Sequence, residues 1–195
     1  MTDWDQCYQQ GATPWDKGEP SPPLEAWLAG RQLSGRALVP GCGLGHDLAL
    51  ITAAGAEATG LDIAPTAVER ARAAYPQLAD CFVLGDLFAP PAEWEGHFDW
   101  IFEHTCLCAL PPARRGDYEQ VVARLLRPGG RLVGIWFIEP EMDPGESGPP
   151  FALPLAELDA LFPADRWRVL DDAVPDVAYP GRHGRERLRV LERLP

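Results

Sequence analysis

The sequence predicts an α/β fold in which a mostly parallel, seven-stranded sheet carries an antiparallel hairpin at one edge and helices on both faces. Two observations support this prediction. Apolar strands and helical segments alternate at least four times between Pro and Gly breaks, and the strands are continuously apolar. Continuous apolar strands are typical of parallel sheets that helices cover on both sides. We expect one domain over residues 1–195, with helices and a loop in 1–30 before the core in 36–195.

The N-terminal segment predicts two short helices separated by a loop. The first helix covers residues 3–10. Residues 11–23 (GATPWDKGEPSPP) contain too many Gly and Pro residues for regular structure, so a loop is expected there. A second helix covers 24–30, and the short apolar strand RALVP at 36–40 runs directly into GCGLG.

Glycine and proline mark the ends of the elements that follow. Gly55 stops the helix after the glycine-rich segment. Pro65 lies in the first turn of the next helix, where a missing N–H costs no hydrogen bond, and Pro76 stops that helix. The expected elements in chain order are a helix over 47–54, a strand over 56–61, a helix over 64–75 and a strand over 81–84.

The second half of the chain continues the alternation and then changes character. The RPGG sequence at 127–130 predicts a turn between a helix and the fifth strand, and a loop rich in Pro and Gly covers 139–150. A long segment without a clear helix joins the last two strands, so we expect them to form the antiparallel edge hairpin. The expected elements are strand 98–102, helix 114–126, strand 131–138, a helix near 154–161, and strands around 167–170 and 187–191.

Composition and charge exclude several classes of function. The 29 acidic and 17 basic side chains give a formal net charge of −12. Nucleic acids and anionic membranes both require a basic surface, so neither is an expected partner. The five cysteines form no CxxC pair, and no secretory leader or membrane-spanning run is visible. We expect a cytoplasmic protein that acts on a small molecule as a monomer or a weak homodimer.

A glycine-rich loop follows the first strand. Gly41, Gly43 and Gly45 allow a tight turn and bring a ligand close to the free N–H groups of a helix N-terminus, which favour a carboxylate or a phosphate. The G-x-G-x-G spacing departs from the G-x-G-x-x-G pattern of dinucleotide-binding proteins. A glycine-rich turn that only connects a strand to a helix is the alternative.

Acidic residues follow the next two strands. Asp62 offers a carboxylate that can accept both hydroxyls of a ribose, although an Asp that caps a helix or faces solvent is the alternative. Asp86 offers a carboxylate for an exocyclic amine, and Leu87 a backbone amide for a ring nitrogen. Ligands of open parallel sheets bind at the carboxyl ends of the strands. Together with the glycine loop, these residues fit S-adenosylmethionine better than a dinucleotide.

The motifs along the chain resemble those of the thiopurine S-methyltransferase-like family, especially its plant and bacterial branch of thiol and halide methyltransferases. The resemblance covers most of the chain from Trp4 to Phe151, and the remainder matches by topology only. Pro40 is more discriminating than the glycines, because many relatives have an acidic residue there. The matching segments are WDQCYQQGATPWDKG, LVPGCGLGHD, TGLDIAPTAVERA, GDLF, FDWIFEHTCLCAL, LLRPGGRL and GPPF.

This resemblance implies a single Rossmann-like class I methyltransferase domain, with a lid in 1–30 and the core in 36–195. It implies methyl transfer from S-adenosylmethionine, which becomes S-adenosylhomocysteine, to a small soft nucleophile such as a thiol, hydrosulfide, a halide or a thiopurine-like sulfur. In-line displacement by such a nucleophile needs alignment and a dry pocket more than acid or base. We therefore expect neither a nucleophilic triad nor a metal ion.

The resemblance also implies roles for single residues in the lid and at the strand ends. In the family, aromatic residues at the positions of Trp4, Tyr8 and Trp15 cover the cofactor, and relatives more often have Trp where Tyr8 stands. A sulfonium cation is attracted to aromatic faces. Packing of an otherwise loose N-terminus is the alternative for Trp15. The positions matching the contacts of the methionine, ribose and adenine parts are Gly41, Gly43, Asp62, Asp86 and Leu87.

The resemblance also implies site residues near the methyl acceptor and the methionine end of the cofactor. His104 stands where plant relatives usually have Tyr and would line the methionine end of the cofactor, unless it is solvent-exposed or a cap. Glu103 matches a family Asp that could orient the cofactor's amino group, with a surface Glu as the alternative. Arg115 matches an arginine that borders the substrate pocket, with a solvated arginine as the alternative. Cys106 and Cys108 are expected to be small buried hydrophobic residues rather than nucleophiles.

Two other classes of function remain open from the sequence. A nicotinamide-dependent oxidoreductase would use a related sheet, but the glycine spacing and the PGG turn before the fifth strand are evidence against it. A non-catalytic module that only binds the cofactor is the second alternative. Among methyltransferases, the acidic charge disfavours an RNA or protein acceptor.

Overall fold

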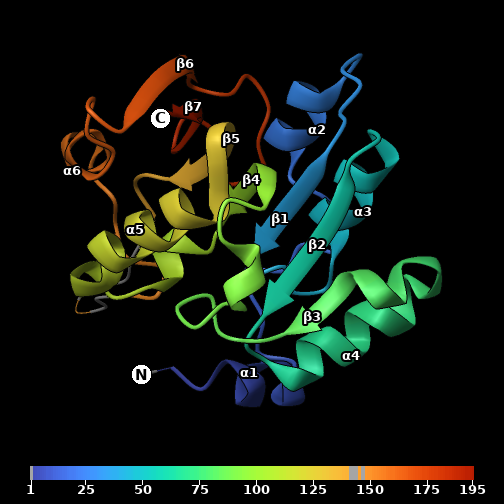
Figure 1. Ribbon diagram of the computed structural model, residues 1–195. Helices are drawn as coiled ribbons and strands as arrows, with labels where there is room; N and C mark the ends of the chain where they lie inside the picture. Colours follow the sequence, from blue (N-terminus) through green and yellow to red (C-terminus); the bar gives the residue numbers. More distant parts are fainter. Residues whose placement is uncertain (1, 141–144, 146–147) are drawn as a thin grey trace.

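Within the described residues, 2–140, 145 and 148–195, seven strands of the computed structural model form one sheet in the order β3-β2-β1-β4-β5-β7-β6 (Figure 1). The predicted loop over 139–150 therefore lies partly outside the described residues. The strands are β1 (Arg36–Pro40), β2 (Glu57–Asp62), β3 (Phe82–Leu84), β4 (Phe98–His104), β5 (Leu126–Phe137), β6 (Trp167–Ala173) and β7 (Glu186–Arg193).

Strand pairing confirms the predicted mixture of parallel sheet and edge hairpin. β1 pairs in parallel with β2 and β4, β2 with β3, and β4 with β5. β7 pairs antiparallel with both β5 and β6, so it lies between them. The chain proceeds outward from β1 through β2 to β3 and then returns to place β4 on the other side of β1. Ligands of open α/β sheets bind beyond the carboxyl ends of the strands at such a reversal.

Helices cover both faces of the sheet, as predicted. One apolar core contains Ile101 and Trp136 of the sheet with Tyr118 of α5, and the other contains Phe102 of β4 with Leu48 of α3. Ile101 and Phe102 are neighbours in one strand, and their side chains point to opposite faces because strand residues alternate. The helices are α1 (Trp4–Gln10), α2 (Pro22–Leu28), α3 (His46–Ala53), α4 (Pro65–Ala74), α5 (Arg115–Leu125) and α6 (Leu155–Leu161).

The structure places the end of β4 two residues later than predicted. The polar pair Glu103 and His104 indicates the end of an apolar strand, but both residues remain paired with β5, and His104 lies opposite Ile135. Their backbone is thus held in the sheet while their side chains reach the carboxyl edge. Short 3-10 helices also occur in the connections, over Pro76–Cys81, Ala92–Trp94, Leu107–Ala109 and Pro112–Arg114.

The RPGG segment differs from the predicted free turn, because it belongs to β5. Phe98 pairs with Leu126, and the register then shifts so that Trp100 pairs with Arg131. Gly129 has a φ of 74°, a left-handed conformation that glycine adopts without strain. The extra residues therefore bulge out of the strand while pairing continues on both sides.

Among the helices that the structure describes, none has the length and apolar character needed to cross a membrane.

Candidate functional site

The glycine loop joins β1 to α3 at the carboxyl edge of the sheet. Gly41, Gly43 and Gly45 have φ values of 62°, 51° and 86°. A Cβ atom at Gly41 would lie 3.3 Å from the Cys106 side chain, and one at Gly43 would lie 2.9 Å from the Tyr8 hydroxyl. Glycine is required in this loop both by the backbone conformation and by the close neighbours.

Asp62 at the end of β2 braces the glycine loop. One carboxylate oxygen accepts a hydrogen bond from the Gly43 N–H at 2.8 Å, and the other accepts from the Ala64 N–H at 2.9 Å. The residue is 7% exposed, and burial raises the pKa of its carboxyl group, although hydrogen bonds from backbone N–H groups oppose this shift. Asp62 therefore contacts the glycine loop, next to which the sequence predicts it to lie.

The end of β3 lies beside the end of β2. The Gly85 N–H donates to the Asp62 carbonyl at 2.9 Å. Asp86 is exposed and its carboxylate accepts from the Phe88 N–H at 2.9 Å, whereas Leu87 is buried. The structure thus brings the ends of β1, β2 and β3 to one edge, as predicted, with β2 between the other two.

Aromatic residues of the N-terminal segment gather over this edge. The Trp15 indole N–H donates to the Tyr8 hydroxyl at 3.2 Å, and the rings of Trp4 and Trp15 meet edge to face at 5.3 Å between centroids. Tyr8 is buried and packs with Ala64 at the start of α4. Figure 1 shows α1 beyond the ends toward which the arrows of β1 and β2 point.

Hydrogen bonds hold the N-terminal segment in place along the whole edge. The Asp5 carboxylate accepts from the Thr66 N–H at 2.7 Å and so caps α4, whose own cap residue makes no side-chain hydrogen bond. The Tyr179 hydroxyl donates to the Glu19 carbonyl at 2.8 Å. The segment before α2 therefore spans from α4 to the connection between β6 and β7.

His104 and Asp47 form a partly buried pair at the end of β4. The Nδ1 atom of His104 lies 2.8 Å from one Asp47 carboxylate oxygen, and the other oxygen accepts from the Ser21 N–H at 2.7 Å. Burial lowers the pKa of His104, but the charge and hydrogen bond of Asp47 outweigh it, so the pKa is raised. The alternative that His104 is solvent-exposed is wrong. Its ring stacks on that of Tyr179 with centroids 6.0 Å apart.

Glu103 is buried on the opposite side of β4. It is 1% exposed, and one carboxylate oxygen accepts from the N–H groups of Cys106 and Leu107 at 2.9 and 3.0 Å. The alternative of a surface glutamate is therefore wrong. Burial raises the pKa of its carboxyl group to about 7.

Burial also raises the thiol pKa of Cys106 and that of Cys108, the latter to about 12, which disfavours a nucleophilic thiolate.

Arg115 is buried and bonded within the protein. It is 3% exposed, so the alternative of a solvated arginine is wrong. Its guanidinium donates to the Glu157 carboxylate at 2.6 Å and to the Ala152 carbonyl at 2.7 Å. These bonds tie α5 to the segment that follows GPPF and to α6. Contact of Arg115 with an acceptor stays a prediction.

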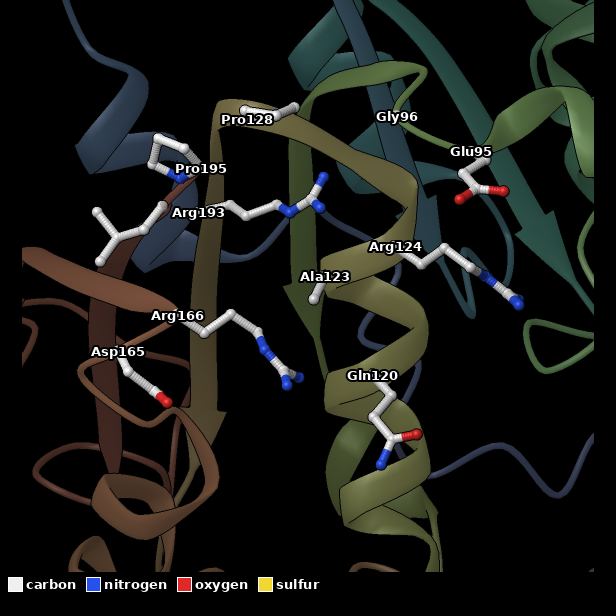
Figure 2. Close-up of a pocket in the computed structure, with 11 residues that line it drawn as sticks. Glu95, Gly96, Gln120, Ala123, Arg124, Pro128, Asp165, Arg166, Arg193 and Pro195 are labelled. Carbon is white, nitrogen blue, oxygen red and sulfur yellow. The ribbon is translucent and has the colours of Figure 1, made fainter.

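A pocket of about 580 Å³ opens at the opposite end of the sheet, among residues of α5, the bulge of β5 and the end of β7 (Figure 2). Two of the arginines that line it are bonded within the protein. Arg166 pairs with Glu119 at 2.8 Å, and Arg193 donates to the Leu126 carbonyl. The pocket adjoins the amino ends of the parallel strands, away from the glycine loop, so it is not the site that the sequence predicts.

Several residues that surround His104 are not marked as site residues by any motif in the sequence. Asp47 directly follows the GLGH part of the glycine motif, so its position in the first turn of α3 was a usable signal. Tyr179, Arg182 and Glu186 belong to the final part of the chain, where no motif marks them. Only the folded chain brings these residues to β4.

Comparisons with known proteins agree on one family. The sequence profile of the family described as Thiopurine S-methyltransferase matches residues 1–193. The chain is 34% identical over 191 residues to the probable thiol methyltransferase 2 of Arabidopsis thaliana, covering 95% of this chain and 82% of the relative. It is 32% identical over 193 residues to thiocyanate methyltransferase 1 of Brassica oleracea, which also covers 95% of this chain and 82% of the relative.

A solved structure supports the fold. The 1,6-didemethyltoxoflavin-N1-methyltransferase of Burkholderia thailandensis, with bound 1,6-didemethyltoxoflavin and S-adenosylhomocysteine, matches with a TM-score of 0.75 at 22% identity. The match covers 99% of this chain and 86% of that chain. At this identity the likeness shows that the two chains share a fold.

Proposed function

Because the chain belongs to the thiopurine S-methyltransferase family and is an S-adenosylmethionine-dependent methyltransferase, we propose that its acceptor is a small soft nucleophile. The candidates are a thiol, hydrosulfide, a halide or a thiopurine-like sulfur. One observation carries this proposal: the N-terminal segment is bonded to α4, to Asp47 of α3 and to Tyr179, so it covers the carboxyl edge of the sheet. A site closed in this way favours a small acceptor.

The residues at this edge fit the cofactor that the family uses. Gly41 and Gly43 leave the backbone of the loop bare, because a Cβ atom at either position would meet a neighbouring side chain. We assign the methionine end of S-adenosylmethionine to this loop and to the start of α3. Asp62 would hold the ribose, and Asp86 and Leu87 the adenine. When bound, the cofactor supplies an electrophilic methyl group on a positively charged sulfur.

The chain's own residues would contribute alignment, dehydration and electrostatics. Trp4, Tyr8 and Trp15 place aromatic rings over the edge, where they would stabilise positive charge and exclude water. Proximity and orientation in a closed site lower a barrier by several kcal/mol without any covalent contribution from the protein. For an acceptor that is already an anion, these contributions suffice.

A binding and turnover panel tests the proposal. Calorimetry should show binding of S-adenosylmethionine and none of NADH. Formation of S-adenosylhomocysteine should then accompany methylation of at least one of the small thiols, hydrosulfide, iodide, thiocyanate or thiopurines. Cofactor binding without turnover on any acceptor would favour the non-catalytic module, and NADH binding alone would favour the oxidoreductase.

We further propose that the protein works in the cytoplasm as a monomer or a weak homodimer and has no nucleic-acid partner. The net charge of −12 supports the last point, since phosphate backbones would be repelled. Light scattering after size-exclusion chromatography should give a mass near that of one chain, with a second copy only at high concentration.

A further inference from the structure

We propose that His104 is the general base that removes the proton from an uncharged thiol acceptor, with Asp47 as its positioning partner. This inference rests on the proposed function and narrows it to acceptors that are protonated at neutral pH. An acceptor that is already an anion needs no base for in-line displacement. A neutral thiol does need one, since the thiolate is the nucleophile.

Both oxygens of Asp47 are engaged, and together they fix the ring of His104. One oxygen lies 2.8 Å from Nδ1, and the other accepts from the Ser21 N–H at 2.7 Å. A carboxylate in this position holds the proton of a neutral imidazole on Nδ1 and leaves the lone pair on Nε2. A base oriented by a third group is the arrangement that activates nucleophiles in many enzymes.

The Nε2 atom of His104 is buried, and no described residue forms a hydrogen bond with it. Buried polar atoms in folded proteins nearly always have a partner, so an orphaned one indicates a missing ligand or a functional role. This atom is the one that the bond to Asp47 leaves free to accept a proton.

The pair lies close to the glycine loop, to which the methionine end of the cofactor is assigned. His104 ends β4, which lies next to β1, and the end of β1 leads into the glycine loop. Thr105, the next residue, has a φ of 62°, which is rare for a residue that is not glycine. Strained backbone of this kind gathers at functional sites. The glycine loop next to the end of β4 would hold the methionine end of the cofactor.

The charged groups around His104 make it a stronger base. Asp47 of α3 makes the direct contact, and the charge of Glu186 on β7 acts in the same direction. Arg182 opposes both, but it pairs with Glu186 at 3.3 Å. Burial lowers the pKa of His104 and the two carboxylates more than compensate. The other titratable groups nearby are Glu103 on the same strand and the stacked Tyr179.

The proposed step balances protons and electrons. The S–H proton of the acceptor moves to Nε2 of His104, and the S–H electron pair stays on the acceptor sulfur. That sulfur forms the new bond to the methyl carbon as the bond between the methyl carbon and the sulfonium breaks, and the electrons of the broken bond neutralise the departing sulfur. The positive charge of the sulfonium is thus replaced by that of imidazolium, which later releases its proton to solvent.

The first test compares two sulfur acceptors in the full-length protein. The wild type, His104→Gln and the matched control His97→Gln are assayed with 2-mercaptoethanol, a neutral thiol, and with thiocyanate, which carries no proton to remove. His97 precedes β4 at the opposite end of the strand. We expect His104→Gln to lower kcat/KM for the thiol at least about 100-fold and to change that for thiocyanate less than about threefold. Calorimetry with S-adenosylmethionine measures the cofactor affinity of each variant separately, so that weaker cofactor binding is distinguished from loss of the base.

The second test measures the imidazole directly and does not depend on turnover. Nitrogen-15 NMR of the protein should show the proton of neutral His104 on Nδ1, and Asp47→Asn should lower the pKa of His104. In the wild type, kcat/KM for neutral thiols should rise with pH through the pKa that NMR gives for His104. Its inflection should stay in place across thiols of different pKa, whereas an enzyme that takes thiolate from solution would follow the pKa of each thiol.

The outcomes are distinguishable. Equal losses for the thiol and thiocyanate in His104→Gln, an unchanged rate for the thiol, or an inflection that follows the thiol would each overturn the role of His104 while leaving methyl transfer intact. A wild-type protein that binds S-adenosylmethionine and methylates no acceptor would overturn the proposed function itself, and the role of the base with it.

Discussion

At the scale of single residues, the buried carboxyl group of Glu103 predicts how the free energy of unfolding depends on pH. Burial raises the pKa of its carboxyl group to about 7, above the ordinary value of 4.5. Between these values the folded state binds a proton that the unfolded state does not, so stability falls as pH rises through 7. We expect this residue to lower the free energy of unfolding by about 3 kcal/mol between pH 5 and 8, since one pKa unit is worth about 1.4 kcal/mol.

Denaturant unfolding of Glu103→Gln across this pH range measures the effect. The amide keeps an oxygen for the N–H groups of Cys106 and Leu107, so the variant should fold and lose the decline above pH 5. Exposed Glu93 provides the control variant Glu93→Gln, which should follow the wild type. Parallel pH curves for the wild type and Glu103→Gln would show that the buried carboxyl does not titrate as stated.

The proposed role of the N-terminal lid (residues 1–30) in cofactor binding is tested at Trp15. Its indole bonds to Tyr8 and packs against Trp4, so Trp15→Ala would open the aromatic cluster beside the glycine loop. We expect calorimetry to show S-adenosylmethionine binding weakened about five- to tenfold, the magnitude of one cation–π contact. Trp15→Phe, which keeps an aromatic face, should retain most of the affinity. Unchanged affinity in Trp15→Ala would remove Trp15 from the cofactor site.

At the scale of elements, Arg115 connects α5 to α6. Replacing it with Met would leave the Glu157 carboxylate and the Ala152 carbonyl without their donor. Hydrogen bonds to a charged group contribute about 2 kcal/mol, so we expect Arg115→Met to lower the free energy of unfolding by about that amount. The half-exposed neighbour Arg114, which pairs with Asp117 at 2.7 Å, provides the control Arg114→Met, with a loss below about 1 kcal/mol.

Kinetics of the same variants separate structure from acceptor binding. If Arg115 only ties α5 to α6, KM for the acceptor and kcat should change together with stability. A raised KM for the acceptor with unchanged denaturant midpoint would contradict the structural role and favour direct contact with the acceptor.

The elements also show where sequence patterns succeed. β1 has the predicted limits because RALVP is apolar and a glycine loop ends it. β4 runs past its predicted end because its partner strand keeps Glu103 and His104 paired, and side-chain polarity carries no information about that partner. The RPGG composition predicts a turn. The structure keeps the segment within β5 because residues on both sides of it pair with β4, and that pairing cannot be read from the local sequence.

Across the whole molecule, the site divides into a part that the sequence predicts and a part that it does not. Gly41 and Asp62 were predictable, because parallel strands bring their carboxyl ends to one edge. The pairing of Asp47 with His104 was not, since the two residues are 57 positions apart and meet only in the folded chain. Tyr179 and Glu186 come from the edge hairpin and its connection, where no sequence motif marks them, although the family profile matches the chain through residue 193.

The net charge of −12 gives a prediction for the whole molecule. An anionic acceptor is repelled at long range, whereas a neutral thiol is not. With the cofactor saturating, we expect kcat/KM for thiocyanate to rise about twofold between roughly 20 and 200 mM salt, as screening shortens the range of the repulsion. The value for 2-mercaptoethanol should stay constant. An equal response of both acceptors would show that the overall charge does not select between them.

The most direct measurement follows the methyl group itself. Enzyme loaded with S-adenosylmethionine carrying a deuterated methyl group is mixed with 2-mercaptoethanol for a single turnover, and the products are identified by mass spectrometry. We predict one deuterated methyl thioether and one S-adenosylhomocysteine per active site, with the yield lost in Asp62→Ala. Bound cofactor with no deuterated product from this thiol, thiocyanate, hydrosulfide, iodide or a thiopurine would contradict methyl transfer to a small soft nucleophile.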